Sequence, residues 1–466
     1  MNIILQHKVS GNYEAKIRLV NTNSVFSARI YFSGDRNTDR AGFLDISQDN
    51  FSIGRTIAGK ENIWKKYGAD YNKRLDIRIL RKGGFYRFWI NEQTAHIRGP
   101  MGEWMGESEP WETNISIDTI NAIAVESFII ESLPWLSEHN EPVLKHGPRG
   151  SFYEEQAIPG CILELDGTYY MYFMAGMSGD EEGASKRTIG LAVSKNLLDW
   201  RVHPKPVIEL GDANFSHDNL YPGSAVIAPD GRVAIIYAAQ KFPKWEGFGM
   251  AMSESPYGPF QQYPGNPIYK HFNENAHEFD LIETENYESR YLMLYAGFTP
   301  EPETGLPGDR AYLITSSDLV NWEFNEKNPV FLPSTLDNWD GTHIRPRSLN
   351  RIDGVWYLWY EGCHGWKPPY PDGQDIQHWD SVGLARSEDL LQWEYYPKNP
   401  ALPGLGTKGQ FDSQWVGWPR MVVKDGIGYV FYTGSGSILP SIGMRQISID
   451  DLVNWGSEGG DKFVVI

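Results

Sequence analysis

Cysteine is nearly absent from the chain, which contains only Cys161 and Cys363 in 466 residues. Two such distant cysteines form neither a disulfide framework nor the spacing of a metal site, so a disulfide-stapled scaffold is excluded. Long hydrophobic runs are also missing. Because a membrane-spanning helix needs about 18 or more apolar residues in succession, no membrane segment is expected.

Basic residues are in the minority, with 42 Lys and Arg against 60 Asp and Glu and a formal net charge of −18. A nucleic-acid partner is therefore excluded, because phosphate neutralisation requires a basic footprint. The sequence begins without a basic stretch followed by a long apolar one, so no signal peptide is expected. This favours a cytoplasmic location for the sequence as written, and a secreted or periplasmic one if a leader has been removed.

Proline is scarce before residue 135, where only Pro100, Pro110 and Pro134 occur. Apolar and polar residues alternate in this part, as in "YEAKIRLV" and "FSARIYF". A period of two is typical of half-buried strands, and no convincing amphipathic helix is present. Residues 1–135 are therefore predicted to form a domain of two packed sheets, a β-sandwich.

After Pro134 the sequence contains a fivefold repeat with two independent markers and an aromatic strand such as "YYMYFMAG" between them. Each unit of about 60 residues is predicted to contain four strands, which makes 136–466 a five-bladed β-propeller and the whole protein all-β. A linear β-solenoid is the alternative, but its units are usually shorter. The first marker is "EPVL" (Pro142), "KPVI" (Pro206), "NPIY" (Pro267), "NPVF" (Pro329) and "NPAL" (Pro400), and the second is "SKNLLDW", "SESPYGPF", "SSDLVNW", "SEDLLQW" and "SIDDLVNW".

These repeats resemble those of the five-bladed propeller glycosidases, a group that includes arabinanases, β-xylosidases, invertases, levansucrases and neoagarobiose hydrolases. The resemblance covers roughly 140–466, and "YPGSAVIAPDGRVAIIYAAQ" is especially similar to the invertase branch. The first part of the sequence resembles the concanavalin-like or laminin-G-like sandwiches often attached to such enzymes. The resemblance implies a glycoside hydrolase that acts on an oligo- or polysaccharide.

The resemblance also implies an active site at one end of the central pore, where the innermost strand of each blade begins. We call this end the mouth. Four of the five strand starts align on a proline, namely Pro159, Pro222, Pro346 and Pro419. In the third blade, counting back from the aromatic strand puts Asp280 in the place of that proline. The stretch "NAHEFDLIE" therefore differs from its four counterparts.

Every strand start carries an acid, and in the first three blades the acids are doubled or adjoin a histidine. Glycoside cleavage needs a proton-donating carboxyl group and a second carboxylate. The resemblance implies a donor two residues before the strand proline, which corresponds to Glu278, with Asp280 as the alternative. Glu155 and Asp218 are then candidates for base, nucleophile or tuning acid. The Asp-Pro pair that these glycosidases usually have in their first two blades is absent from this sequence.

The other acids and the aromatic residues near the mouth have structural explanations as well. An Asp at position 340 or 412 can cap a turn, Arg345 can pair with Asp340, and tryptophans can serve blade packing. No acidic loop resembles a calcium motif, so neither a metal nor a cofactor is expected. The candidate substrate-binding residues are His343, Arg345, Glu361, Trp415, Trp418, Tyr221, His217 and His277.

Two other functions stay open. A transglycosidase or a phosphorylase can use the same scaffold, and the arginines Arg345, Arg347 and Arg420 are possible anion ligands for the latter. A non-catalytic carbohydrate-binding propeller is the third possibility, although doubled acids favour an enzyme. The sequence does not predict the sugar, the linkage, the stereochemical outcome or the oligomeric state.

Overall fold

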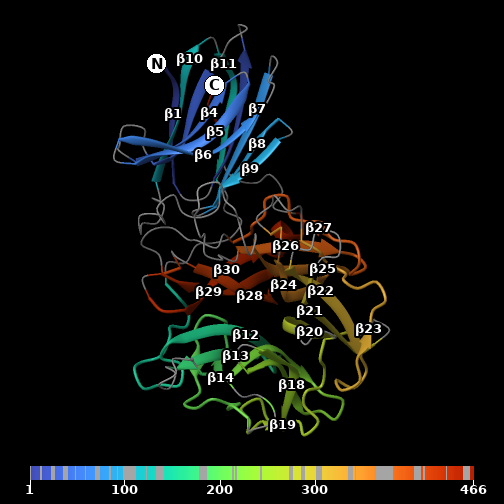
Figure 1. Cartoon of the computed structure of the whole chain (residues 1–466). Coiled ribbons are helices and arrows are strands. Elements are labelled where there is room, and N and C mark those ends of the chain that lie inside the picture. Colours follow the sequence, from blue (N-terminus) through green and yellow to red (C-terminus); the bar gives the residue numbers. More distant parts are fainter. Residues whose placement is uncertain are drawn as a thin grey trace. The chain divides into compact units, whose positions relative to one another are not determined.

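The computed structural model divides into two compact units, which are described separately (Figure 1). The first comprises Met1–Leu136, Pro403–Gln414 and Gly456–Ile466, and the second comprises Ser137–Leu402 and Trp415–Trp455. None of the helices in the described part of the protein is long and apolar enough to cross a membrane. The structure describes residues 2–10, 13–21, 27–34, 40–47, 49–57, 59–68, 74–82, 85–91, 93–97, 112–121, 123–132, 141–177, 186–211, 215, 218–241, 244–271, 276–284, 289–300, 307–333, 340–341, 343–363, 381–402, 411–412, 415–436, 438–454 and 462–465.

The first unit contains two six-stranded antiparallel sheets. Alternate residues of both sheets are buried in one core, for example Ile17 and Leu19 from one sheet and Ile30 and Phe32 from the other. Period-two burial from two facing sheets is the arrangement of a β-sandwich. One sheet has the order β1 (Asn2–Ser10), β10 (Glu112–Asn121), β3 (Ser27–Gly34), β4 (Arg40–Ser47), β5 (Asn50–Ile57) and β6 (Lys60–Gly68). The other has the order β31 (Lys462–Val465), β11 (Ile123–Ser132), β2 (Tyr13–Asn21), β7 (Arg74–Lys82), β8 (Phe85–Ile90) and β9 (Gln93–Ile97).

The final strand, β31, is part of this sandwich, because it pairs with β11. The propeller predicted over 136–466 therefore extends beyond the structural boundary at its C-terminal end. The repeat markers stop before β31, and hydrogen bonding to a strand far earlier in the sequence leaves no local pattern.

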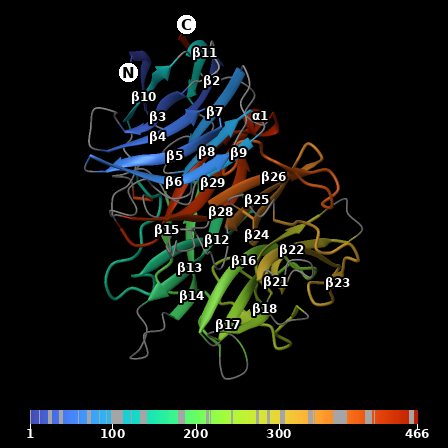
Figure 2. The ribbon, with the colours of Figure 1, turned by 45° about the horizontal axis from the view of Figure 1, so that its top comes forward.

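The second unit contains five successive antiparallel blades, of which the first two are joined into one eight-stranded sheet by a parallel bridge between Arg187 and Asn219. Their first strands contact one another in sequence order and β28 contacts β12, so the inner strands form a closed ring; Figure 2 shows the blades in colours from green to red. Blade 1 is β12 (Gln156–Leu165), β13 (Thr168–Met177), β14 (Lys186–Ser194) and β15 (Arg201–Val202); blade 2 is β16 (Asn219–Ile227), β17 (Val233–Lys241), β18 (Lys244–Ser253) and β19 (Gln261–Gln262). Blade 3 is β20 (Ala276–Glu283), β21 (Tyr291–Pro300), β22 (Pro307–Ser316) and β23 (Glu323–Phe324); blade 4 is β24 (His343–Ile352), β25 (Val355–Cys363), β26 (Ser381–Ser387) and β27 (Glu394–Tyr395); blade 5 is β28 (Trp415–Lys424), β29 (Ile427–Ser435) and β30 (Ser441–Ser448), followed by α1 (Ile449–Val453).

The Pro-Val segments bridge to the third strands of the blades. Ile208 pairs with Ile189 of β14, and the corresponding segments of the next three blades do the same. In blade 5 the partner of Ile442 in β30 is Leu144, which comes from the first Pro-Val segment. The motif "EPVL" therefore completes the last blade instead of opening the first, and it closes the ring with the first residues of the propeller.

Hydrogen bonds explain the Ser-x-Asp-Leu-x-x-Trp marker. Ser316 Oγ accepts from the Leu319 N–H at 2.9 Å, and the indole of Trp322 donates to the Leu319 carbonyl at 3.1 Å. Burial opposes ionisation of Asp318, but hydrogen bonds from Asn321 and neighbouring groups lower its pKa to about 2. Leu319 has a φ of 69°, a conformation that needs such support.

The same turn recurs at 194–200 and 387–393, whereas the fifth copy forms a helix. There Ser448 is the N-cap of α1, and its Oγ accepts from the Asp451 N–H at 3.0 Å. The serine thus has one role in both settings, since it satisfies a backbone donor that otherwise has no partner.

Replacing Ser316 with Ala should destabilise the propeller by about 1 kcal/mol, because the Leu319 N–H loses its acceptor in a turn that contains a left-handed residue. Urea unfolding followed by tryptophan fluorescence measures the change. Glu326→Ala, at an exposed position shortly after the turn, is the control and should leave the midpoint unchanged. Equal midpoints for the two variants would contradict the role of the serine.

Candidate functional site

The register of the inner strands corrects the predicted position of Asp280. Pro159, Pro222 and Pro346 pair with the same position of their aromatic strands, and in blade 3 that position, Tyr295, pairs with Phe279. Phe279 therefore stands in the place of proline, and Asp280 lies one step further from the mouth. Residues at the level of Asp280 are Cys161, Ser224, Ser348 and Arg420.

The predicted position of Asp280 is wrong because blade 3 differs both in the turn between its first two strands and in the place of its bulge. Counting back from the aromatic strand assumed equal turns, but 166–167 joins the strands of blade 1 whereas 284–290 joins those of blade 3. A sequence count cannot separate a longer turn from a shifted strand.

Glu278 lies in a β-bulge between His277 and Phe279. In blades 1, 2 and 4 the bulge follows the proline instead, so blade 3 differs from them at the residue predicted to donate the proton. Bulges redirect side chains and are frequent beside active sites. The side chains of His277 and Glu278, and the whole of His217, lie outside the described residues.

Glu155 and Asp218 lie at the mouth on neighbouring blades, and both are half-buried. The Glu155 N–H donates to the carbonyl of Gly176 at 3.1 Å, which ties it to β13. The Asp218 N–H donates to the carbonyl of Gln240 at 3.1 Å, which ties it to β17. Backbone hydrogen bonds thus hold both predicted carboxylates at the same end of the ring as Glu278.

An aromatic contact crosses the ring just below the mouth. Tyr221 of blade 2 stacks on Trp418 of blade 5, with ring centroids 5.9 Å apart and planes 21° apart, although these blades are not neighbours. The Tyr221 hydroxyl donates to Gln240 at 3.0 Å and accepts from Arg187. Tyr221 and Trp418 are each 8% exposed, so they form a floor rather than free surfaces for sugar stacking. Trp415 is less buried and remains a candidate for stacking.

Glu361 holds this floor in place. Its carboxylate is fully buried, accepts from Arg347 Nε at 2.6 Å, and accepts from the Trp418 N–H at 2.6 Å. The Arg347 guanidinium lies 3.5 Å from the centre of the Trp418 ring. A Cβ on Gly417 would lie 2.5 Å from Glu361 Oε1, so a larger residue there would displace this carboxylate. The buried carboxylate of Glu361, which was predicted to bind substrate, positions Trp418 through these partners, and its contact with substrate stays a prediction.

His343 and Arg345 both contact the carboxylate of Asp309, which is not among the residues predicted from the sequence. Asp309, near the start of β22, has its Oδ2 3.0 Å from His343 Nδ1 and accepts from Arg345 Nε at 2.7 Å. Arg345 therefore pairs with Asp309 rather than with Asp340, whose carboxylate accepts from the Tyr360 hydroxyl at 2.8 Å. The third strand of each blade also begins at the mouth, so an acid near the start of such a strand, like Asp309, could have been predicted as a site residue.

His343 is only 1% exposed, which favours a structural role over direct contact with a sugar. Arg345 is 20% exposed at its side chain and stays a candidate for binding substrate. Among the described residues, no group of three or more His, Cys, Asp or Glu side chains is placed to hold a metal ion.

Comparison with known proteins identifies related folds. The model of the family "Glycosyl hydrolases family 32 N-terminal domain" matches residues 158–334, which include blades 2 and 3. A search of curated protein sequences finds no match.

Solved structures resemble the protein over about two thirds of its length. A structure described as "Glycoside hydrolase" has a TM-score of 0.52 and 17% identity, and the match covers 66% of this protein and 90% of that one. A glycosyl hydrolase from Bacteroides ovatus has a TM-score of 0.50 and 14% identity, with 68% and 93% covered. A structure from the study of the GH130 family of mannoside phosphorylases, which "contains glycoside hydrolases that target beta-1,2 mannosidic linkages in Candida mannan", has a TM-score of 0.51 and 14% identity, with 68% and 93% covered. At these identities the likeness establishes the fold.

Proposed function

We propose that the protein, whose propeller is similar in fold to those of glycoside hydrolases, hydrolyses a glycosidic bond in an oligo- or polysaccharide. The observation that carries the proposal is the gathering of acids at one end of the ring. Glu155 and Asp218 directly precede the inner strands of blades 1 and 2, and Glu278 lies near the start of the inner strand of blade 3. Hydrolysis of a glycoside needs two such carboxyl groups on either side of the bond.

In the proposed mechanism Glu278 donates the proton to the leaving oxygen, and Glu155 or Asp218 acts as nucleophile or as base toward water. The bulge at Glu278 turns this residue out of the regular strand pairing. The floor of Tyr221 and Trp418 closes the pore beneath the sugar, and Trp415 supplies an aromatic face beside it.

Asp280 supports this mechanism by holding the strand that carries Glu278 in place. Its oxygens accept from Ser224 of blade 2 at 3.0 Å and from the Leu349 N–H of blade 4 at 2.7 Å. These bonds fix β20 two residues beyond Glu278. With both oxygens held below the mouth, Asp280 is a positioning residue, and Glu278 is the proton donor.

A phosphorylase is the second candidate, because a similar structure comes from a family of mannoside phosphorylases. Two of the arginines that suggested an anion site already hold carboxylates, Arg345 with Asp309 and Arg347 with Glu361. A phosphate ion would have to compete with these ion pairs, which favours water as the acceptor.

Assays on a panel of aryl glycosides and oligosaccharides, with and without inorganic phosphate, test the proposal. We expect release of reducing sugar at a rate that phosphate does not change. A glycosyl phosphate product would identify a phosphorylase. Binding of oligosaccharides without turnover of any substrate would identify a carbohydrate-binding propeller and overturn the assignment as an enzyme.

A further inference from the structure

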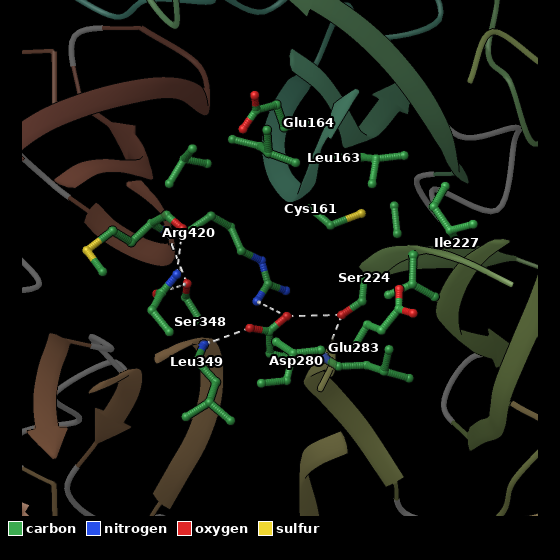
Figure 3. A pocket seen from close by; sticks show the side chains of 18 of the residues that line it. Cys161, Leu163, Glu164, Ser224, Ile227, Asp280, Glu283, Ser348, Leu349 and Arg420 are labelled. Carbon is green, nitrogen blue, oxygen red and sulfur yellow. Dashed lines mark hydrogen bonds and ion pairs between the residues drawn. The ribbon is translucent and has the colours of Figure 1, made fainter. Parts of the chain in front are cut away.

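A cavity of about 390 Å³ lies on the propeller axis, away from the mouth. It is lined by 161–165, 224–227, 280–283, 348–350 and 420–422, one segment from each inner strand (Figure 3). These segments follow the bulges of the strands, so the cavity occupies the half of the channel that lies beyond the level of Asp280. No residue proposed to act at the mouth, other than the positioning residue Asp280, lines it.

Arg420 separates this cavity from the mouth. Its guanidinium extends from blade 5 and donates to the carbonyls of Gly160 in blade 1 and Phe279 in blade 3, the latter at 3.2 Å. The side chain is only 6% exposed. Contacts with blades 1 and 3 place the guanidinium across the axis, and Figure 3 shows it directed toward Asp280 and Ser224.

One nitrogen of this guanidinium has an unused hydrogen-bonding capacity. Arg420 Nη1 is buried without a hydrogen-bond partner among the described residues, and it lies 3.9 Å from Asp280 Oδ1. That separation is too long for a direct hydrogen bond, but one oxygen atom can bridge both groups. A hydroxyl group suits the position, because it can accept from the guanidinium and donate to the carboxylate.

The charges around the cavity select against ions. Asp280, Glu164 and Glu283 line the cavity with one cationic side chain, that of Arg420, while Glu283 also forms an ion pair with Arg290 outside the lining. An anion would meet an excess of negative charge, and a cation at the deep end would meet the guanidinium. No described cluster of ligands fits a metal ion. A neutral polyhydroxylated molecule has the required hydroxyl groups and no net charge.

The walls and the volume refine the ligand class. Leu163, Ile227 and Leu281 supply apolar surface on which the C–H groups of a sugar can pack. Small-molecule pockets range from about 300 to 1,000 Å³, so this cavity is at the small end and suits one sugar ring rather than a longer oligosaccharide.

We propose that the axial cavity is a second carbohydrate site, which binds a neutral monosaccharide or small polyol through a hydroxyl group that bridges Arg420 and Asp280. The site is separate from the mouth, and its occupation does not require the protein to be a hydrolase. A ligand there would contact all five inner strands and thereby stabilise the closed ring.

Isothermal titration of the full-length protein with glycerol, D-xylose and D-mannose tests the proposal. We expect saturable binding of at least one of them, weakened about tenfold or more by Leu163→Trp, which fills the cavity from blade 1. Val423→Trp is the matched control, because Val423 is 39% exposed and lies beside the cavity strand segment without lining the cavity. Turnover at the mouth should persist in both variants.

Ile227→Trp fills the cavity from blade 2 and provides an independent variant should Leu163→Trp fail to fold. Binding that survives either folded cavity variant would assign the sugar to the mouth and overturn the proposal. The absence of saturable binding to the wild type, or a crystal structure with these probes that holds only water between Arg420 and Asp280, would overturn it as well. Loss of binding in the cavity variants with retained turnover supports it, whatever the reaction at the mouth.

Discussion

Glu278→Gln should lower kcat on unactivated glycosides by about a thousandfold while KM changes little, because the amide keeps the shape of the side chain but cannot donate a proton. The loss should be much smaller on dinitrophenyl glycosides, whose leaving groups depart without protonation. Steady-state kinetics on a phenyl and a dinitrophenyl glycoside of the same sugar measure both effects. The bulge at Glu278 and the strand starts of the neighbouring blades are the structural basis for this expectation.

Asp280→Asn is the matched comparison, since it makes the same chemical change two residues along β20. As a positioning residue it should affect both substrates by similar factors and shift the pH profile of kcat. If the loss of kcat depended on the leaving group in Asp280→Asn but not in Glu278→Gln, Asp280 would be the proton donor and Glu278 the positioning residue. Thermal unfolding of both variants shows whether lost activity is lost folding.

Arg420→Met should destabilise the propeller by about 3–5 kcal/mol at pH 8, because it leaves the buried carboxylate of Asp280 without its cation. The variant also removes the donors that hold the carbonyls of Gly160 and Phe279 across the axis. Urea unfolding measures the loss. The double variant Arg420→Met with Asp280→Asn should be more stable than Arg420→Met alone at pH 8, since no unpaired charge remains. A double variant that is no more stable would contradict the pairing.

The stability lost in Arg420→Met should also depend on pH. Burial raises the pKa of Asp280 from 3.8 to about 6, although Arg420, Leu349 and Ser224 act in the opposite direction. The folded protein therefore holds this proton more tightly than the unfolded protein, and the corresponding stability is present below pH 3.8 and is lost as the pH rises through 6. Removal of the cation raises the pKa further. The deficit of Arg420→Met should thus be smaller at pH 5 than at pH 8, because the charge of Asp280 depends on pH whereas the loss of the donors to Gly160 and Phe279 does not. A deficit independent of pH would exclude Asp280 as a cause.

The architecture of the propeller was readable from the sequence because its signals are local. The Ser316 turn uses hydrogen bonds between residues at most a few positions apart, so the same letters recur wherever the turn recurs. Alternation in 1–135 likewise follows from one face of each strand being buried, as Ile17 and Leu19 are. The positions of Glu155 and Asp218 at the mouth follow from these repeats.

The roles of individual site residues depended on contacts between blades. Glu361 was predicted to meet substrate because it ends an aromatic strand, and only the neighbouring Arg347 and Trp418 show that it is buried support. Asp309 lies in the third strand of blade 3 and acquires its role from His343 and Arg345 of blade 4. No spacing in the sequence encodes such pairs.

The sequence by itself determined the all-β class, the fivefold repeat and the end of the ring where acids gather, since each of these follows from short-range patterns of burial and turn formation. Tertiary structure alone decided the level at which Asp280 stands, the aromatic floor of Tyr221 and Trp418, and the cross-axis position of Arg420. Ring closure brings together residues from blades that are distant in the sequence. Their separation across the axis depends on bulges and turn lengths, whose effects appear only when the strands pair.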